Sequence, residues 1–233
     1  MATYRRPGAL AGAMYLLTHV TSVGAVVLYG TMLTDEAWGE GGGSALPQQL
    51  GALLDVVLAV AIVGTAVALY PHVRRRSQTG AIAYVGLRTL EAGVAAVGAV
   101  MVMAAVQMRD VGQADVAAGL VETYTWAFFV GPGLVVGVHT VVLAAVLRRH
   151  ALVPQWITWL GLVGAPLVTA SNLLIFFGLQ DQVSVTASLA AVPIFAWEIS
   201  LALFLILKGL RLRAPDADAQ EVAAPGGPVA SRV

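Results

Sequence analysis

The sequence predicts an all-α membrane protein, a polytopic bundle of six transmembrane helices with both termini in the cytoplasm. Of the 233 residues, 58% are hydrophobic and only 11% are charged, whereas a soluble domain averages about 25% charged residues. Six apolar stretches each reach the ~20 residues that a helix needs to cross a bilayer. The basic residues gather at alternate connections between these stretches, and this asymmetry sets the orientation.

The apolar stretches predict helices, in chain order, at residues 8–32, 49–72, 80–107, 123–147, 155–178 and 184–209. The first stretch follows Arg5 and Arg6 as a signal peptide would, but it is too long for one and is expected to remain as a helix. Pro132 falls inside the fourth stretch, where a membrane helix tolerates a proline kink. The helices form one domain over residues 1–212, and the acidic, Ala- and Pro-rich residues 213–233 are predicted to be a disordered cytoplasmic tail.

The basic residues predict which side of the membrane each connection occupies. Arg109 is the basic residue of one side of the six-helix serpentine. The other side has ten, namely Arg5, Arg6, Arg74, Arg75, Arg76, Arg148, Arg149, Lys208, Arg211 and Arg213. Because connections rich in lysine and arginine stay in the cytoplasm, we expect a multi-pass protein of the cell membrane with both termini cytoplasmic.

Composition also excludes several functions. The formal net charge of zero leaves no electrostatic footprint for nucleic acid. The absence of cysteine excludes disulfides, thiol catalysis and thiolate-bound metals, and no metal site or cofactor is predicted. His19 and His139 are expected at the same depth in the membrane, so they could in geometry be the two axial ligands of a b-type haem. No further haem signature accompanies them.

Ionisable residues inside the predicted helices define the candidate site, because buried charge is costly in a membrane and is associated with function. At 1.5 Å per residue, most of these groups lie ~13–16 Å from the cytoplasmic helix ends, with Arg88 one turn closer. The layer near the midplane contains His19, Arg88, Glu91, His139 and Glu198. Asp55 and Asn172 lie in the outer half of the membrane, and Trp197 is placed beside Glu198 to wall a pocket.

Arg88 and Glu91 have more than one interpretation. Their spacing of three places both on one face of the third helix, where each offsets part of the insertion cost of the other. In the structural interpretation, the pair locks neighbouring helices together without any chemistry. In the functional one, the layer is a ligand or reaction site, or a path for protons or ions.

Five blocks in order resemble a known bacterial family. They are RRPGALAGAMYLLTHVTSV, GALLDVVLAVAIVGTAVALYPHVRRR, AYVGLRTLEAG, LRRHALVPQWITWLGLVGAPL and AWEISLALFLILKGL. Together they resemble the domain-of-unknown-function family 4386 over about residues 7–212. The resemblance implies a six-helix protein of the bacterial cytoplasmic membrane. It also implies that Arg88, Glu91, Glu198 and Lys208 belong to the family pattern, whereas the two midplane histidines do not, and it brings no established activity.

The favoured function is to bind or act on a small hydrophobic, lipid- or isoprenoid-like molecule at the midplane cluster. Glu91 and Glu198 are the candidate catalytic acids, and the candidate binding residues are Arg88, His19, His139, Trp197, Asp55 and Asn172. One alternative is an acid-catalysed enzyme such as a membrane terpene cyclase, with Tyr84, Phe195 and Trp197 stabilising a carbocation through their rings. The others are a small proton-coupled exporter, working as a homodimer, and a structural or partner subunit of a membrane complex.

Overall fold

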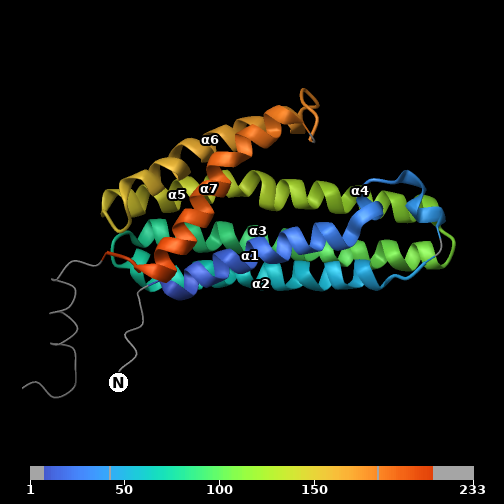
Figure 1. Cartoon of the computed structure of the whole chain (residues 1–233), viewed down its shortest axis with the longest axis horizontal. Helices are drawn as coiled ribbons and strands as arrows, with labels where there is room; N and C mark the ends of the chain where they lie inside the picture. Colours follow the sequence, from blue (N-terminus) through green and yellow to red (C-terminus); the bar gives the residue numbers. More distant parts are fainter. Residues whose placement is uncertain (1–7, 42, 183, 212–233) are drawn as a thin grey trace, which may run out of the picture.

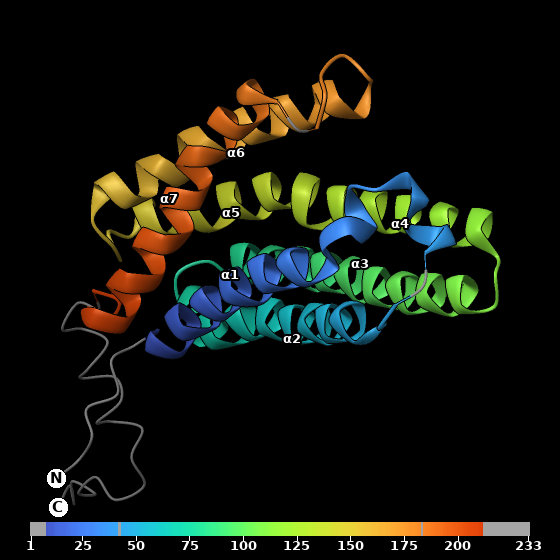
Figure 2. The ribbon, with the colours of Figure 1, turned by 45° about the vertical axis from the view of Figure 1, so that its right-hand side comes forward.

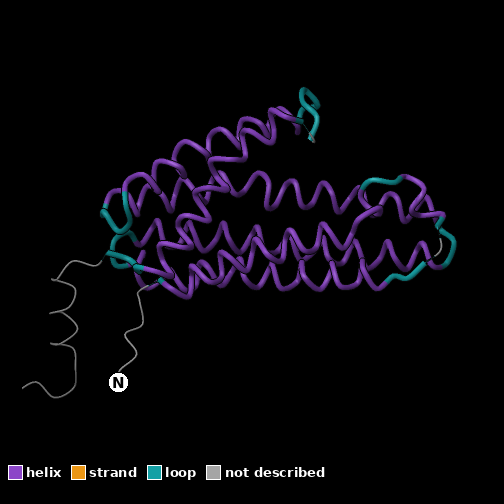
Figure 3. The backbone as a smooth tube through the Cα atoms, viewed as in Figure 1, coloured by secondary structure: helices purple, strands orange, loops and turns teal. Residues whose placement is uncertain are grey.

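The computed structural model of the protein describes residues 8–41, 43–182 and 184–211, and all the regular structure in this part of the chain is helical (Figure 3). The predicted tail at 213–233 lies outside the described residues. The α-helices are α1 (Ala9–Tyr29), α2 (Leu46–Arg74), α3 (Gln78–Asp110), α4 (Ala114–Phe128), α5 (Val136–Arg149), α6 (Gln155–Phe176) and α7 (Val185–Leu207). Two 3-10 helices, η1 (Gly30–Leu33) and η2 (Glu36–Glu40), follow α1, and a π-helical segment, η3 (Phe129–Val135), joins α4 to α5.

Within the part of the chain that the structure describes, six helical segments are long and apolar enough to cross a membrane, which confirms the predicted six-span, multi-pass architecture. The fourth is the continuous run α4–η3–α5 from Ala114 to Arg149, and it begins well before the predicted start at residue 123. The third span, α3, has 33 residues and is about 50 Å long at 1.5 Å per residue. Since the hydrocarbon core is about 30 Å thick, both of these spans project beyond it.

Consecutive spans run antiparallel, and α1, α2 and α3 pack side by side next to α4 and α5 (Figure 1). The hairpin of α6 and α7 lies on the other side of α5, and α7 returns to pack along α1. Figure 2 shows the loop end of this hairpin diverging from the rest of the bundle. The connections α2–α3 and α5–α6 and the end of α7 lie at one end of the molecule, so the described basic residues at or beyond the ends of the spans, apart from Arg109, gather there.

Small residues allow α7 to approach its neighbours closely. A Cβ atom on Gly12 of α1 would lie 2.5 Å from the carbonyl oxygen of Ala202 in α7, and one on Gly164 of α6 would lie 2.7 Å from the backbone nitrogen of Ile194. Close backbone approach through small residues is a common way to join membrane helices, where water provides no hydrophobic driving force. This packing holds α7 against α1 and thereby brings Glu198 to the inner layer of the bundle.

The apolar side chains divide between core and periphery. One buried cluster surrounds Tyr84 and Leu143 toward the basic end, and a second surrounds Tyr29 and Tyr124 toward the opposite end. Many large aliphatic and aromatic side chains are exposed along the outer faces of the spans, such as Val27, which is 73% exposed. Such a surface is suited to lipid, and the polar layer predicted by the sequence lies inside the bundle.

Candidate functional site

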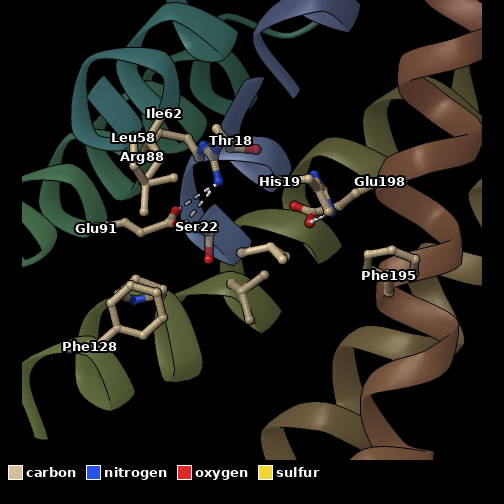
Figure 4. Close-up of a pocket in the computed structure, with 13 residues that line it drawn as sticks. Thr18, His19, Ser22, Leu58, Ile62, Arg88, Glu91, Phe128, Phe195 and Glu198 are labelled. Atoms are coloured by element: carbon tan, nitrogen blue, oxygen red, sulfur yellow. Dashed lines mark hydrogen bonds and ion pairs between the residues drawn. The ribbon is translucent and has the colours of Figure 1, made fainter. Parts of the chain in front are cut away.

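A cavity of about 240 Å³ lies at the polar layer, among α1, α2, α3, α7 and the α4–η3–α5 span. Figure 4 shows Arg88 and Glu91 at one side of it and His19 and Glu198 at the other. The remaining lining is mostly apolar, consisting of Thr18, Ser22, Val23, Leu58, Ile62, Phe128, Pro132, Val136 and Phe195. The cavity therefore combines mostly apolar walls with two separate pairs of ionisable groups.

The first pair is a buried salt bridge within α3. Nη1 of Arg88 donates to both carboxylate oxygens of Glu91, at 3.1 Å and 2.9 Å. The two residues are only 2% and 4% exposed. The spacing of three residues predicted this pairing, because such positions are neighbours on a helix surface. Opposite charges in contact offset much of the cost of burying either one.

Three other helices hold this pair in place. Nε of Arg88 donates to the hydroxyl of Thr65 in α2 at 3.1 Å, and the guanidinium carbon lies 5.6 Å from the ring centroid of Tyr15 in α1. The Tyr15 hydroxyl is 2.6 Å from that of Tyr84, which belongs to α3. His139 of α5 lies on the far side of the carboxylate, with Nε2 3.1 Å from Oε2 of Glu91. Helices α1, α2, α3 and α5 therefore meet at one polar network.

The contacts of His139 tie it to both members of the salt bridge. Nε2 lies 3.1 Å from both Nη1 of Arg88 and the carboxylate of Glu91. Nη1 can only donate and the carboxylate only accepts, so Nε2 accepts from Arg88 in one tautomer and donates to Glu91 in the other. Nδ1 of His139 is buried and has no partner among the described residues.

The second pair joins α1 to α7. Nδ1 of His19 lies 2.8 Å from the carbonyl oxygen of Tyr15, which only accepts, so Nδ1 carries a hydrogen. Nε2 of His19 is 3.4 Å from Oε2 of Glu198. This contact is favourable when one proton lies on either the imidazole or the carboxyl group. The two side chains are 17% and 16% exposed, and both line the cavity.

The π-helical turn η3 shapes the opposite wall. Pro132 lies within it and lines the cavity, between Phe128 and Val136. Proline lacks an N–H group, and widened π turns interrupt the regular hydrogen bonding of a helix. The carbonyl of Gly133 accepts a 2.6 Å hydrogen bond from Nδ2 of Asn172 in α6. The proline kink predicted from the sequence is thus a π turn that α6 supports.

The structure brings together five of the eight candidate site residues. His19, Arg88, Glu91 and Glu198 line the cavity, and His139 contacts the first salt bridge from behind. The other three lie outside its lining: Asp55, Asn172 and Trp197.

Each of these three has a distinct packing environment. Asp55 accepts a 2.5 Å hydrogen bond from the Tyr29 hydroxyl, toward the opposite end of the bundle from the basic connections. Trp197 is fully buried against α6, where a Cβ atom on Gly161 would lie 2.8 Å from its ring. Asn172 supports the π turn. The wall position expected for Trp197 is occupied by Phe195, whose ring meets that of His19 edge-on at 5.2 Å.

Sequence reasoning missed Tyr15 and Thr65 as parts of the polar network. Tyr15 precedes His19 by four residues, so helical spacing alone places both on one face of α1 and is a usable signal. Thr65 has no such signal, because its own helix offers no ionisable neighbour at that spacing. Its hydroxyl also donates to the carbonyl of Ile62 at 2.7 Å, a common bond for a threonine in a helix.

A family model described as a domain of unknown function, DUF4386, matches residues 10–209. The chain belongs to the DUF4386 family. The match spans all six membrane helices and confirms the resemblance noted in the sequence. Searches against curated proteins and against solved structures gave no significant match for this DUF4386 protein.

The side chains at the cavity of this DUF4386 protein are suited to acid–base and hydrogen-bonding chemistry. The cavity offers a guanidinium group fixed by its counter-charge and a histidine–carboxyl pair. Such a set can orient a polar group and exchange a proton with it. Within residues 8–41, 43–182 and 184–211, no group of three or more histidine, aspartate or glutamate side chains is arranged to hold a metal ion.

Proposed function

We propose that this membrane protein binds a small lipid-soluble molecule, lipid- or isoprenoid-like, with its polar group in the midplane cavity. The observation that carries the proposal is the juxtaposition of the Arg88–Glu91 and His19–Glu198 pairs across one apolar cavity. A purely structural clamp needs the first pair alone and no space beside it. Ligand sites, in contrast, are apolar clefts with a few convergent polar groups.

The rim of the cavity supports access from the lipid. Val23 of α1 and Phe195 of α7 line the cavity and are also 61% and 55% exposed. Both lie within membrane spans, so the exposed side of each faces the bilayer. A ligand dissolved in lipid would enter between α1 and α7 without passing through water.

The volume of the cavity limits what it holds. An apolar protein cavity of about 150 Å³ binds benzene. By that measure, the 240 Å³ here accommodates roughly ten non-hydrogen atoms. A longer molecule would place its polar end inside and extend its tail past Val23 and Phe195 into the bilayer.

The first experiment is mass spectrometry of organic extracts from the detergent-purified protein, wild type beside Glu198→Gln. We expect a specific lipid-soluble compound to be enriched with the wild type and lost or altered with the variant. Glu122→Gln is the matched control, because Glu122 is exposed on α4 and does not line this cavity.

The outcomes separate the proposal from a structural role. If all three extracts contain only bulk phospholipid and Glu198→Gln is less stable than Glu122→Gln, the polar layer is a packing clamp, and the protein is better regarded as a subunit of a membrane complex. If the compound is bound equally by both variants, the ligand lies elsewhere.

A second candidate, an acid–base enzyme, is favoured by the 3.4 Å contact between Nε2 of His19 and Oε2 of Glu198. A proton donor at an apolar wall is suited to protonating an alkene or epoxide, as membrane terpene cyclases do. Turnover of the extracted compound would support this function. Flux of the compound driven by a pH gradient, without chemical change, would instead support the proton-coupled exporter, for which we propose a homodimer.

We further propose that the protein lies in the bacterial cytoplasmic membrane with both termini in the cytoplasm. The gathering of basic residues at the α2–α3 and α5–α6 connections supports this orientation. The chain has no cysteine, so single-cysteine variants label cleanly. Gln182→Cys should react with a membrane-impermeant maleimide on intact cells, and the matched variant Gln155→Cys should react only after lysis. The reverse pattern contradicts the orientation.

A further inference from the structure

The formal charges of the salt bridge at the midplane cavity cancel. Arg88 carries one positive charge and Glu91 one negative charge in direct contact. His139 contacts the same carboxylate through Nε2 at 3.1 Å. The hydroxyls of Tyr15 and Tyr84 bond to each other behind Arg88 and are uncharged.

One donor nitrogen of Arg88 makes no hydrogen bond to the described residues. Its Nη1 is engaged by Glu91 and its Nε by Thr65. The second terminal nitrogen, Nη2, has no hydrogen-bond partner among the residues that the structure describes. Because Arg88 lines the cavity, this nitrogen is available to a ligand as a donor whose charge is already compensated.

This arrangement discriminates between head groups by charge. A neutral oxygen, such as a hydroxyl or carbonyl, can accept from Nη2 and leaves the charge balance unchanged. A phosphate or carboxylate would bring an extra negative charge into an apolar cavity that already contains the carboxylate of Glu91. An unpaired buried charge is strongly unfavourable.

We propose that the ligand is a neutral amphiphile, an alcohol or ketone whose oxygen is bound by Nη2 of Arg88, and that anionic esters with the same tail are rejected. This inference rests on the proposed function and specifies the ligand class of the same site. The test uses farnesol and farnesyl monophosphate, which share one tail and differ in head-group charge, and farnesane, which has no polar group.

Binding is measured with the full-length protein in nanodiscs of zwitterionic lipid, by competition of each unlabelled compound against tritiated farnesol. We expect farnesol to bind at least tenfold more tightly than farnesyl monophosphate, and farnesane more weakly than farnesol. Glu91→Gln removes the counter-charge of Arg88, so this variant should reverse the order and prefer the phosphate. Glu122→Gln should keep the order of the wild type.

The wild-type comparison decides the proposal even if Glu91→Gln does not fold. Farnesyl monophosphate binding as tightly as farnesol, or more tightly, would overturn the neutral-ligand inference and leave the proposed function standing. Farnesane binding as tightly as farnesol would contradict the proposal that Nη2 of Arg88 binds the oxygen of the ligand. If none of the three compounds binds, the inference is overturned. If, in addition, the organic extract contains only bulk phospholipid, the proposed function is overturned with it.

Discussion

Replacing Glu91 by glutamine should destabilise the protein, because it leaves the guanidinium group of Arg88 buried without a counter-charge. Arg88 is only 2% exposed, and both of its ionic hydrogen bonds go to Glu91. Breaking a buried pair by removing one partner costs about 3–5 kcal/mol, and an unpaired arginine at the centre of a membrane helix costs roughly 2.5–3.5 kcal/mol. Both figures predict a loss of about 3 kcal/mol, roughly a hundredfold in the unfolding equilibrium.

The double variant Arg88→Met/Glu91→Leu should recover most of that stability. Buried ion pairs replaced together by apolar residues of similar size are often neutral in stability or gain about 1–4 kcal/mol. The partners left behind are the Thr65 hydroxyl, which keeps its bond to the carbonyl of Ile62, and Nε2 of His139. The double variant should therefore fold but fail to bind the ligand, which separates the stabilising role of the pair from its role in the cavity.

The assay is reversible unfolding in mixed micelles, titrated with sodium dodecyl sulfate, on the wild type, Arg88→Met, Glu91→Leu, the double variant and Glu91→Gln. The coupling energy follows from the first four values. A Glu91→Gln protein as stable as the wild type would refute the reasoning, since the guanidinium charge would then be solvated by some other route. A double variant no more stable than Glu91→Gln would refute it as well.

Three further variants test contacts between helices outside the cavity lining. Gly161→Ala should cost about 1–3 kcal/mol, because the added methyl group overlaps the ring of Trp197, and a loss of thermal stability in detergent would verify this. Tyr29→Phe should cost about 1–3 kcal/mol by removing the donor to the buried carboxyl group of Asp55, whereas unchanged unfolding would show that water replaces the hydroxyl. Asn172→Ala should cost about 0.6–1.7 kcal/mol, because it frees a carbonyl of the π turn, and faster hydrogen exchange confined to that turn is the expected signature.

The number of spans was accessible from the sequence, whereas the start of the fourth span was not. Hydropathy is a local property, so six apolar stretches predict six spans without knowledge of their packing. Residues 114–122 precede the apolar run of that span and include Asp115 and Glu122, so their sequence is typical of a loop between the third and fourth spans. They are helical because α4 continues along α3 beyond the apolar core, where tertiary contacts outweigh the local signal.

The sequence indicated which residues share the candidate site better than it indicated which of them contact one another. Depth along a helix follows from counting residues, and the three residues that it places in one layer, His19, Glu91 and Glu198, line one cavity in the structure. The partner of each residue depends on how neighbouring helices are rotated and tilted. For this reason the sequence did not pair His19 with Glu198, or assign Trp197 to the α6 interface instead of the cavity wall.

By itself, then, the sequence determined the membrane location, the six spans and the set of ionisable groups that must face inward, because a bilayer penalises each exposed polar group locally. The tertiary structure alone decided that these groups form two separate pairs across a cavity and that Asp55 and Asn172 lie apart from it. The physical reason is the close packing of small residues such as Gly12 against α7, which sets where each helix face points and which no local pattern specifies.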